Sequence, residues 1–394
     1  MSPQRFRPTR AEVDAGAISR NTRRLLAAAG EGAALCAVVK ADGYGHGIAT
    51  AARAALAGGA SWLAVALVEE GIVLREAGIT TPILVLSEPP PDAAAAMVAH
   101  DLTPTVYRAD FLRALEDGVR GEPARAPMRV HVKVDTGMTR VGLAPDERDA
   151  FLAQLAASDV LDVEGVQTHL ARADEPDVPT TTEQLARFAA ALDAVRAAGL
   201  APRLVHVANT AATLVHTEAW RAVVASGAPD AVPLVRAGIG LYGLDAGTHV
   251  QAVVHGLEPA MRLVSAVSHV RRVEAGTPVS YGHRWASPAA GWLATVPIGY
   301  ADGVPRPLTG RLDVLHDGIR RPVVGTITMD QVLVWCGDDG PTVGDEIVLI
   351  GAGSAGGSGP GDRIGMEEWA QRLGTITYEI ATGVSARVPR IERG

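Results

Sequence analysis

Residues 35–77 read LCAVVKADGYGHGIATAARAALAGGASWLAVALVEEGIVLREA, and this stretch decides the fold class. Two short apolar, β-branched runs, at 35–40 and 62–66, each precede a longer segment with helical period, at 46–57 and 68–77. This alternation of strand and helix is typical of βα units, whose strands form a parallel sheet.

The same alternation continues to about residue 236. Six further strands are expected, at 82–86, 102–107, 129–135, 163–168, 203–208 and 233–236. Helical segments such as 182–198 lie between the strands, and the eight strands together favour a closed parallel barrel, the (β/α)8 or TIM barrel. We therefore predict an α/β fold whose barrel domain covers residues 1–247.

After about Asp245 the sequence changes in character. Alternating valine-rich segments such as VSAVSHVRRV, RRPVVGTITM and DEIVLIG are separated by Gly, Pro and Asp-Gly turns, a pattern typical of antiparallel strands. We predict a C-terminal antiparallel β domain over residues 248–394, with a first strand at about 7–13 pairing with it. The Gly- and Ser-rich stretch at 351–362 lacks the GK[ST] ending of a phosphate-binding loop, so we interpret it as a surface loop.

Composition argues against several classes of protein. Hydrophobic residues make up 47% of the chain and charged residues 20%, without an apolar run long enough to cross a membrane, so we expect a soluble globular protein. The net charge of -8 repels a phosphate backbone and argues against nucleic acid as a partner. Cys36 and Cys336 lack the spacing of a metal site or a disulfide framework, and the N-terminal residues contain no export signal. We expect a cytoplasmic protein without a bound metal.

The lysine content is unusually low. Of the 36 basic residues only Lys40 and Lys133 are lysines, and the others are arginines. An arginine stays protonated and is a poor nucleophile, whereas a buried lysine can lose its proton and form a Schiff base or a carbamate. Both lysines are therefore candidates for chemistry, although the chance survival of two lysines in a biased composition is the alternative.

Polar residues close or directly follow the expected strands at their carboxyl ends, where chemistry takes place in barrels of this type. The residues at these positions are Lys40, Lys133, Asp135, His169, Asn209, Thr210 and Arg236. Each of them alone could be a buried structural residue. Several charges at one mouth are costly to bury unless a ligand or partner compensates them, so this end of the barrel is the expected active site.

The segment AVVKADGYGHG at 37–47 resembles the pyridoxal phosphate attachment segment of the bacterial alanine racemases, which are fold-type III enzymes. The likeness extends along nearly the whole chain, through RPTRAEVD, KVDTGMTRVGL, THLARADE, HVANTAAT, VRAGIGLYG, VSYGHRW, VPIGYADG, TITMDQ and TITYEIATGVSARVPR. It implies pyridoxal 5'-phosphate as cofactor and alanine as substrate. It also implies a homodimer with shared active sites, in which the β domain of one subunit covers the barrel of the other.

The resemblance implies four catalytic roles. Lys40 would carry the cofactor and act as one proton-transfer base, and Tyr281 would be the second base on the opposite face of the substrate. His169 would link Tyr281 to Arg236, which would contact the pyridine nitrogen of the cofactor. Because an arginine keeps its proton, the ring would be a weaker electron sink, which favours return of the proton over transamination.

Binding roles follow from the same resemblance. Cofactor contacts are implied for Lys40, Tyr44, His169, Asn209, Thr210, Arg236, Gly238, Ile239 and Tyr378. Arg140 and the backbone at Met329 would bind the substrate carboxylate, next to Tyr281. Thr210 stands where the family commonly has serine, and Thr328 stands where some members have cysteine.

Lys133 resembles a position that is carbamylated in some family members. The alternative is a plain lysine paired with Asp135. We favour the carbamate, because an anion at this position could hold Arg140 whereas an ammonium would repel it.

These observations lead us to expect pyridoxal phosphate-dependent racemisation of L-alanine and D-alanine by two bases, supplying D-alanine for peptidoglycan. Four alternatives are a broad-specificity amino-acid racemase, a non-enzymatic pyridoxal phosphate-holding barrel, a fold-type III decarboxylase of basic amino acids and a catalytically inactive interaction protein. The last would not need the two lysines and Tyr281. The holding barrel would end near residue 245 and lack Tyr281. The decarboxylase would place a carboxylate where this chain has Arg236.

Overall fold

The computed structural model describes residues 6–122, 124, 127–353 and 363–393, which form two compact units. The barrel unit comprises Ala17–Gly43 and Ile48–Glu258. The sheet unit comprises the described residues of Met1–Gly16, Tyr44–Gly47 and Pro259–Gly394. A domain boundary at 247/248 remains a prediction, and most of the Gly- and Ser-rich stretch at 351–362 lies outside the described residues.

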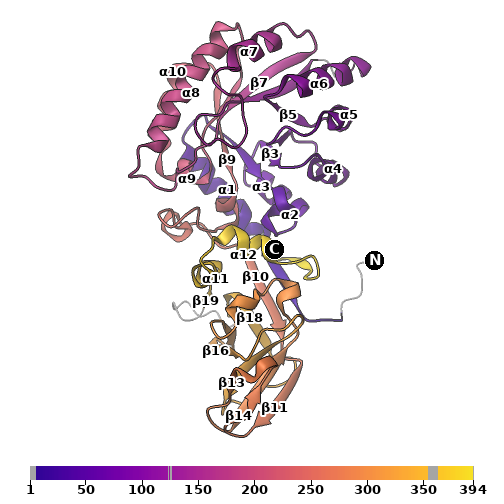
Figure 1. The fold of residues 1–394 in the computed structure, drawn as a ribbon, viewed down its shortest axis with the longest axis vertical. Coiled ribbons are helices and arrows are strands. Elements are labelled where there is room, and N and C mark those ends of the chain that lie inside the picture. The colour runs from indigo at the N-terminus through magenta and orange to yellow at the C-terminus, as the bar shows by residue number, and fades with distance from the viewer. Residues whose placement is uncertain (1–5, 123, 125–126, 354–362, 394) are drawn as a thin grey trace. The chain divides into compact units, whose positions relative to one another are not determined.

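Eight parallel strands close into a barrel, as predicted (Figure 1). The ring closes where the last of these strands pairs with the first, with Arg236 opposite Cys36. Each strand overlaps one of the predicted ranges: β2 (Ala34–Val38), β3 (Trp62–Val65), β4 (Ile83–Val85), β5 (Thr103–Val106), β6 (Met128–Lys133), β7 (Leu161–Gln167), β8 (Leu204–His206) and β9 (Val232–Ala237).

Helices lie around the outside of these strands (Figure 1). In α6, for example, Phe111, Leu112, Leu115 and Val119 share one face, and that face is buried. The helices are α1 (Ala15–Ala29), α2 (Lys40–Tyr44), α3 (Ile48–Ala57), α4 (Val68–Glu76), α5 (Ala94–Ala99), α6 (Ala109–Gly121), α7 (Arg148–Ala156), α8 (Thr180–Ala197), α9 (Thr210–Val215) and α10 (Thr217–Gly227). Short 3-10 turns follow at η1 (Pro91–Ala93), η3 (Ile239–Tyr242) and η4 (Ala252–His255).

Aromatic and imidazole side chains fill part of the barrel core. The rings of His131 and His206 lie 4.7 Å apart at 78°, and Trp62 lies 5.1 Å from His131. Both histidines are fully buried, and burial lowers the pKa of each. The core therefore contains two neutral imidazoles rather than aliphatic side chains alone.

The sheet unit is built on one large, mainly antiparallel sheet, which confirms the predicted fold class of this part of the chain. Along the sheet the strands are β11 (His269–Val273), β14 (Gly291–Val296), β17 (Val332–Gly337), β16 (Ile319–Val324), β15 (Asp313–His316), β18 (Glu346–Ala352), β10 (Met261–Ala266), β1 (Arg10–Asp14) and β20 (Arg390–Arg393), with β19 (Arg363–Ile364) on β18. The pair β1 and β20 is parallel.

Smaller elements complete the sheet unit. They are the two-stranded sheet of β12 (Pro278–Val279) and β13 (Trp285–Ala286), the helices α11 (Met366–Leu373) and α12 (Thr377–Gly383), and the turns η5 (Tyr281–His283), η6 (Tyr300–Asp302) and η7 (Arg306–Leu308). In neither unit does a described helix have both the length and the apolar character to cross a membrane.

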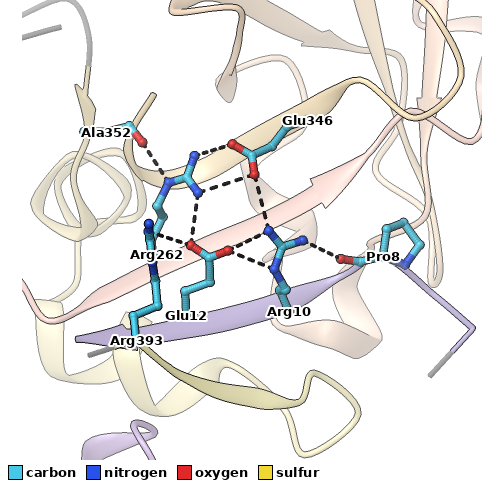
Figure 2. A network of polar contacts seen from close by, with 7 residues as sticks. All are labelled: Pro8, Arg10, Glu12, Arg262, Glu346, Ala352 and Arg393. Carbon is cyan, nitrogen blue, oxygen red and sulfur yellow. Dashed lines mark hydrogen bonds and ion pairs between the residues drawn. The ribbon is translucent and has the colours of Figure 1, made fainter. Parts of the chain in front are cut away.

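A network of charges holds β1 to its neighbours (Figure 2). The carboxylate of Glu12 accepts hydrogen bonds from Arg10 at 2.8 Å, from Arg262 at 3.0 Å and from Arg393 at 2.9 Å. Arg10 and Arg262 also reach Glu346 on β18. Burial alone would raise the pKa of Glu12, but the hydrogen bonds from Arg262 and Arg10 outweigh burial and hold the pKa below its usual value.

We expect Glu12→Gln to destabilise the sheet unit by roughly 2 kcal/mol at pH 7, because three guanidinium groups lose their shared anion. A carboxyl group whose pKa is depressed by folding stabilises the protein above its unfolded pKa and loses that contribution as pH falls through the folded value. In urea unfolding, the difference from wild type should therefore shrink as pH falls below the ordinary glutamate range. A constant difference at all pH values, or an equal effect of the exposed Glu274→Gln, would contradict this expectation.

Candidate active site

The segment that carries Lys40 has an unusual backbone. Strand β2 ends at Val38, and the next turn places Ala41, Asp42, Gly43 and Tyr44 at φ of 52°, 53°, 62° and 52°. Three of these residues are not glycine, and each costs about 1–2 kcal/mol in this left-handed conformation. A Cβ on Gly43 would lie 2.8 Å from the Ala51 side chain, so this position needs glycine. The turn after Lys40 is therefore strained and must be held by its surroundings.

Five basic side chains influence one another at the mouth of the barrel: Lys40, Lys133, Arg140, His169 and Arg236. Burial and then Arg140 lower the pKa of Lys40, while Glu70 opposes them. Burial, followed by the charges of Arg236, Arg140 and Lys40, lowers the pKa of Lys133 to about 8. Both amines are therefore closer to their neutral, nucleophilic form than an exposed lysine would be.

The carboxylate next to Lys133 is engaged elsewhere. Asp135 Oδ1 accepts hydrogen bonds from the amides of Gly137, Met138 and Thr139, at 2.9 to 3.1 Å. In the part of the chain that the structure describes, Lys133 forms no ion pair with Asp135. Oδ1 of Asp135 therefore shapes the turn that leads to Arg140, while the charge of Asp135 still favours the protonated form of Lys133. The plain Lys133–Asp135 pair and the carbamate both remain predictions.

Arg236 is the buried cation of the site. Its Nη2 donates to the carbonyl of Thr168 at 2.6 Å and lies 3.3 Å from Nδ1 of His169, while its Nη1 is buried without a partner among the described residues. Burial lowers the pKa of Arg236 to about 10. Burial and then Arg236 lower the pKa of His169 well below its usual value, so the imidazole is neutral and its Nδ1 can accept a hydrogen bond from Arg236 Nη2.

Gln184 on α8 joins the loop that bears His169 to the loop that leads to Arg140. Its Oε1 accepts from the amide of Ala171 at 2.8 Å, which leaves Nε2 to donate to the His169 carbonyl at 3.0 Å and to Thr136 Oγ1 at 3.2 Å. The hydroxyl of Thr136 lies 2.8 Å from that of Thr168. These buried contacts fix His169 relative to the Lys133–Arg140 segment.

A hydroxyl and backbone amides lie together after β8 and β9. Asn209 begins α9, and its side chain accepts from the amide of Ala212 at 3.0 Å. Thr210 Oγ1 accepts from the amide of Gly238 at 3.1 Å, and Ile239 begins the following 3-10 turn. The structure thus brings four of the residues expected to bind the cofactor to the mouth of the barrel: Asn209, Thr210, Gly238 and Ile239.

Tyr281 lies in a tight turn of the sheet unit. Its neighbours Ser280, Gly282 and His283 have φ of 62°, 74° and 47°, and Thr326 Oγ1 donates to its carbonyl at 2.8 Å. The Tyr281 side chain is 74% exposed. The backbone of the residue is therefore fixed while its phenol projects from the sheet unit.

The other expected site residues of the sheet unit form a pair and a turn. The rings of Tyr44 and Tyr378 lie 6.0 Å apart, and burial raises the pKa of Tyr44. Met329 is 51% exposed, and its carbonyl accepts from the amide of Ala301 at 3.0 Å. Among the described residues, no group of three or more His, Cys, Asp or Glu side chains could hold a metal ion.

Comparison with known proteins gives the family. A model of the alanine racemase N-terminal domain matches residues 13–246, and a model of the alanine racemase C-terminal domain matches residues 260–392. The chain belongs to the alanine racemase family. The alanine racemase of Thermobifida fusca is 44% identical over 388 residues, which cover 98% of each protein. That of Symbiobacterium thermophilum is 44% identical over 390 residues, which cover 99% of this chain and 98% of the relative.

Solved structures agree with this assignment. The crystal structure of alanine racemase from D-cycloserine producing Streptomyces lavendulae has a TM-score of 0.89 and 36% identity, with 99% of this chain and 98% of that chain covered. A histidine racemase from Leuconostoc mesenteroides has a TM-score of 0.85 and 25% identity, with 99% of each chain covered. As an alanine racemase family member that matches both family domains, the protein is an amino-acid racemase, not a barrel that only holds a cofactor.

Proposed function

We propose that the protein interconverts L-alanine and D-alanine with pyridoxal 5'-phosphate bound at Lys40, by a two-base mechanism that supplies D-alanine for peptidoglycan in the cytoplasm. The observation that carries the proposal is the set of basic groups at one barrel mouth: Lys40, Lys133, Arg140 and Arg236. Such a set favours anionic ligands, and both an aldehyde-bearing phosphate ester and an amino-acid carboxylate have the required charge.

The donor groups of the site fit this cofactor. Lys40 offers an amine with a lowered pKa, and Arg236 Nη1 is a buried donor that is without a partner among the described residues. A ring nitrogen that accepts from Nη1 would satisfy it. Thr210, with the amides of Gly238 and Ile239, would bind the phosphate in the barrel unit, and Asn209 shapes the adjoining helix start. Tyr44 and Tyr378 would supply phenol groups to the same phosphate.

Bound pyridoxal phosphate would withdraw electrons from the α-carbon of the amino acid and make its α-proton acidic. Lys40 Nζ and Tyr281 Oη would then each hold or release a proton, one on each face of the α-carbon. His169, neutral and 3.3 Å from Arg236, would relay the guanidinium charge toward the tyrosine. The exchange of one proton between two faces inverts the configuration without any other change in the substrate.

Arg140 and the backbone at Met329 would bind the substrate carboxylate. We also propose that Lys133 is carbamylated. Its pKa of about 8 leaves a fraction of free amine, whose nitrogen can bond to CO2 with release of a proton. The resulting anion could pair with Arg140 and hold it toward the substrate.

We further propose that the active enzyme is a homodimer with shared sites. Tyr281 and Met329 are both largely exposed, at 74% and 51%, although they are expected to work in an enclosed site. A second copy of the chain would cover them and supply the barrel residues that face them.

The proposed reaction is tested by adding pyridoxal phosphate and L-alanine in deuterated water. We expect visible absorbance from the bound cofactor, loss of optical rotation, and one deuterium at the α-carbon for each inversion. Because a histidine racemase shares this fold at 25% identity, a broad-specificity racemase is the second candidate, and the same assay with other amino acids separates the two. Cofactor binding without incorporation of deuterium at the α-carbon of any amino acid would contradict both racemase candidates.

We expect Tyr281→Phe to slow α-proton exchange from L-alanine by roughly 100- to 10,000-fold, and exchange from D-alanine much less. The phenyl ring keeps the shape of the side chain but cannot carry the proton, while Lys40 still serves the face exposed in D-alanine. Single-turnover exchange of each enantiomer with solvent measures the two half-reactions separately. Equal losses from both enantiomers would show that the two bases are wrongly assigned.

A further inference from the structure

Glu70, in the first turn of α4, accepts hydrogen bonds from two different loops at the barrel mouth. One carboxylate oxygen, Oε2, accepts from the amides of Ala66 and Leu67 at 2.8 and 3.1 Å. The other, Oε1, accepts from the amide of Ala41 at 2.6 Å. The first pair of contacts caps the helix to which Glu70 belongs. The third has no role in that cap, because Ala41 follows β2 and the cap lies after β3.

The amide of Ala41 belongs to the peptide that directly follows Lys40. It is also the first amide of the left-handed turn, in which Ala41, Asp42 and Tyr44 adopt an unfavourable conformation. Two other hydrogen bonds close the far part of this segment, from Gly43 to the Val39 carbonyl and from Ile48 to Asp42 Oδ1, both at 2.8 Å. The Glu70 contact reaches the peptide of Lys40 from a different βα unit.

The electrostatic environment of Lys40 also links this residue to Glu70. Burial and the charge of Arg140 disfavour the charged form of the Lys40 amine, whereas Glu70 favours it. Lys133 and His169 share the same mouth and are basic as well. The carboxylate that favours the charged form of Lys40 is therefore the same one that holds the turn.

We propose that Glu70 is a positioning residue for Lys40: its carboxylate fixes the peptide after Lys40 and provides the amine with a compensating negative charge. This inference rests on the proposed function, in which Lys40 carries the cofactor and transfers a proton. A displacement of about 1 Å in such a group is enough to reduce turnover by up to ~100-fold.

The two-lysine composition permits a direct test on the full-length chain freed of cofactor. Trace acetic anhydride is applied over a range of pH, and acetylation of the Lys40 peptide is compared with that of the Lys133 peptide by mass spectrometry. In Glu70→Gln, loss of the anion should lower the pKa of Lys40 and raise the Lys40-to-Lys133 labelling ratio near pH 8 by roughly threefold. The matched control is Glu69→Gln, an exposed neighbour, which should leave the ratio unchanged.

The second measurement is turnover of the cofactor-loaded enzyme. We expect Glu70→Gln to lower kcat by roughly 10- to 100-fold and to change KM by less than about twofold, because Arg140 is untouched. Glu70→Asp keeps the charge and can still cap α4, but it is too short to reach Ala41 as well. It should therefore lower kcat while preserving the wild-type labelling ratio, and it provides the test if Glu70→Gln does not fold.

A labelling ratio or a kcat in Glu70→Gln equal to that of Glu69→Gln would overturn the inference. So would full activity in Glu70→Asp. If the proposed function is wrong, the cofactor is found on a residue other than Lys40 in the wild-type enzyme and in the Glu70 variants alike. That result is distinct from an unchanged labelling ratio or an unchanged kcat.

Discussion

Lys40→Arg is expected to reduce racemisation by at least ~10,000-fold, the largest effect of any single substitution considered for this chain. Arginine preserves the positive charge and much of the side-chain volume. Its guanidinium, however, stays protonated at working pH and cannot attack an aldehyde or take up an α-proton. The loss would therefore report the chemistry of a primary amine and not the electrostatics of the barrel mouth.

The matched control is Lys133→Arg, the same substitution at the other lysine. It should retain bound cofactor and part of the activity, since its proposed role is to hold Arg140. Borohydride reduction of the wild-type enzyme, followed by peptide mapping, should find the cofactor on Lys40 and not on Lys133. A labelled peptide elsewhere, or substantial activity in Lys40→Arg, would refute the assignment of the carrier lysine.

Mixing two inactive variants is expected to restore roughly a quarter of wild-type activity. Lys40→Ala lacks the proposed carrier lysine, and Tyr281→Phe lacks the proposed second base. If each site combines Lys40 of one subunit with Tyr281 from the other, a mixed dimer has one site with both defects and one intact site. Random pairing makes half of the dimers mixed, so a quarter of all sites are intact.

The experiment unfolds an equal mixture of the two variants together and refolds it with pyridoxal phosphate. As a control, each variant is unfolded and refolded alone, which measures how much folded protein the procedure recovers. An unrescued mixture, with dimers present by light scattering, would mean that Lys40 and Tyr281 act within the same subunit. A monomeric wild-type enzyme with full activity would contradict the shared site directly.

The barrel could be predicted from the sequence because its signals are local. Most of the strands are short runs of largely buried, β-branched or apolar residues, and helical segments separate them, so period and length identify both elements. The prediction of a β domain over residues 248–394 did not include the helix α11 (Met366–Leu373). Its buried residues Met366, Trp369 and Ala370 have helical spacing that a closer inspection of 366–373 could have detected.

Contacts between distant residues could not be predicted in the same way. Lys40 and His169 follow strands and Arg236 lies near the carboxyl end of β9, so the barrel rule alone places them at one mouth. Glu70 and Gln184 lie inside helices, and their partners Ala41 and Thr136 are far away in the sequence. The left-handed backbone at Ala41 was also unpredictable, because alanine rarely adopts this conformation and it depends on the surrounding hydrogen bonds.

The position of β1 has a consequence for the order of folding during synthesis. This strand leaves the ribosome before the barrel, yet its two partners in the sheet, β10 and β20, are Met261–Ala266 and Arg390–Arg393. The barrel strands and helices can assemble as soon as Glu258 has emerged, while β1 must wait with both hydrogen-bonding edges unpaired. Arg10, Glu12 and Asp14 give that strand three charged side chains in five residues, which hinders its pairing with other nascent chains. Shortening the C-terminus by the β20 residues should therefore impair assembly of the sheet unit more than that of the barrel.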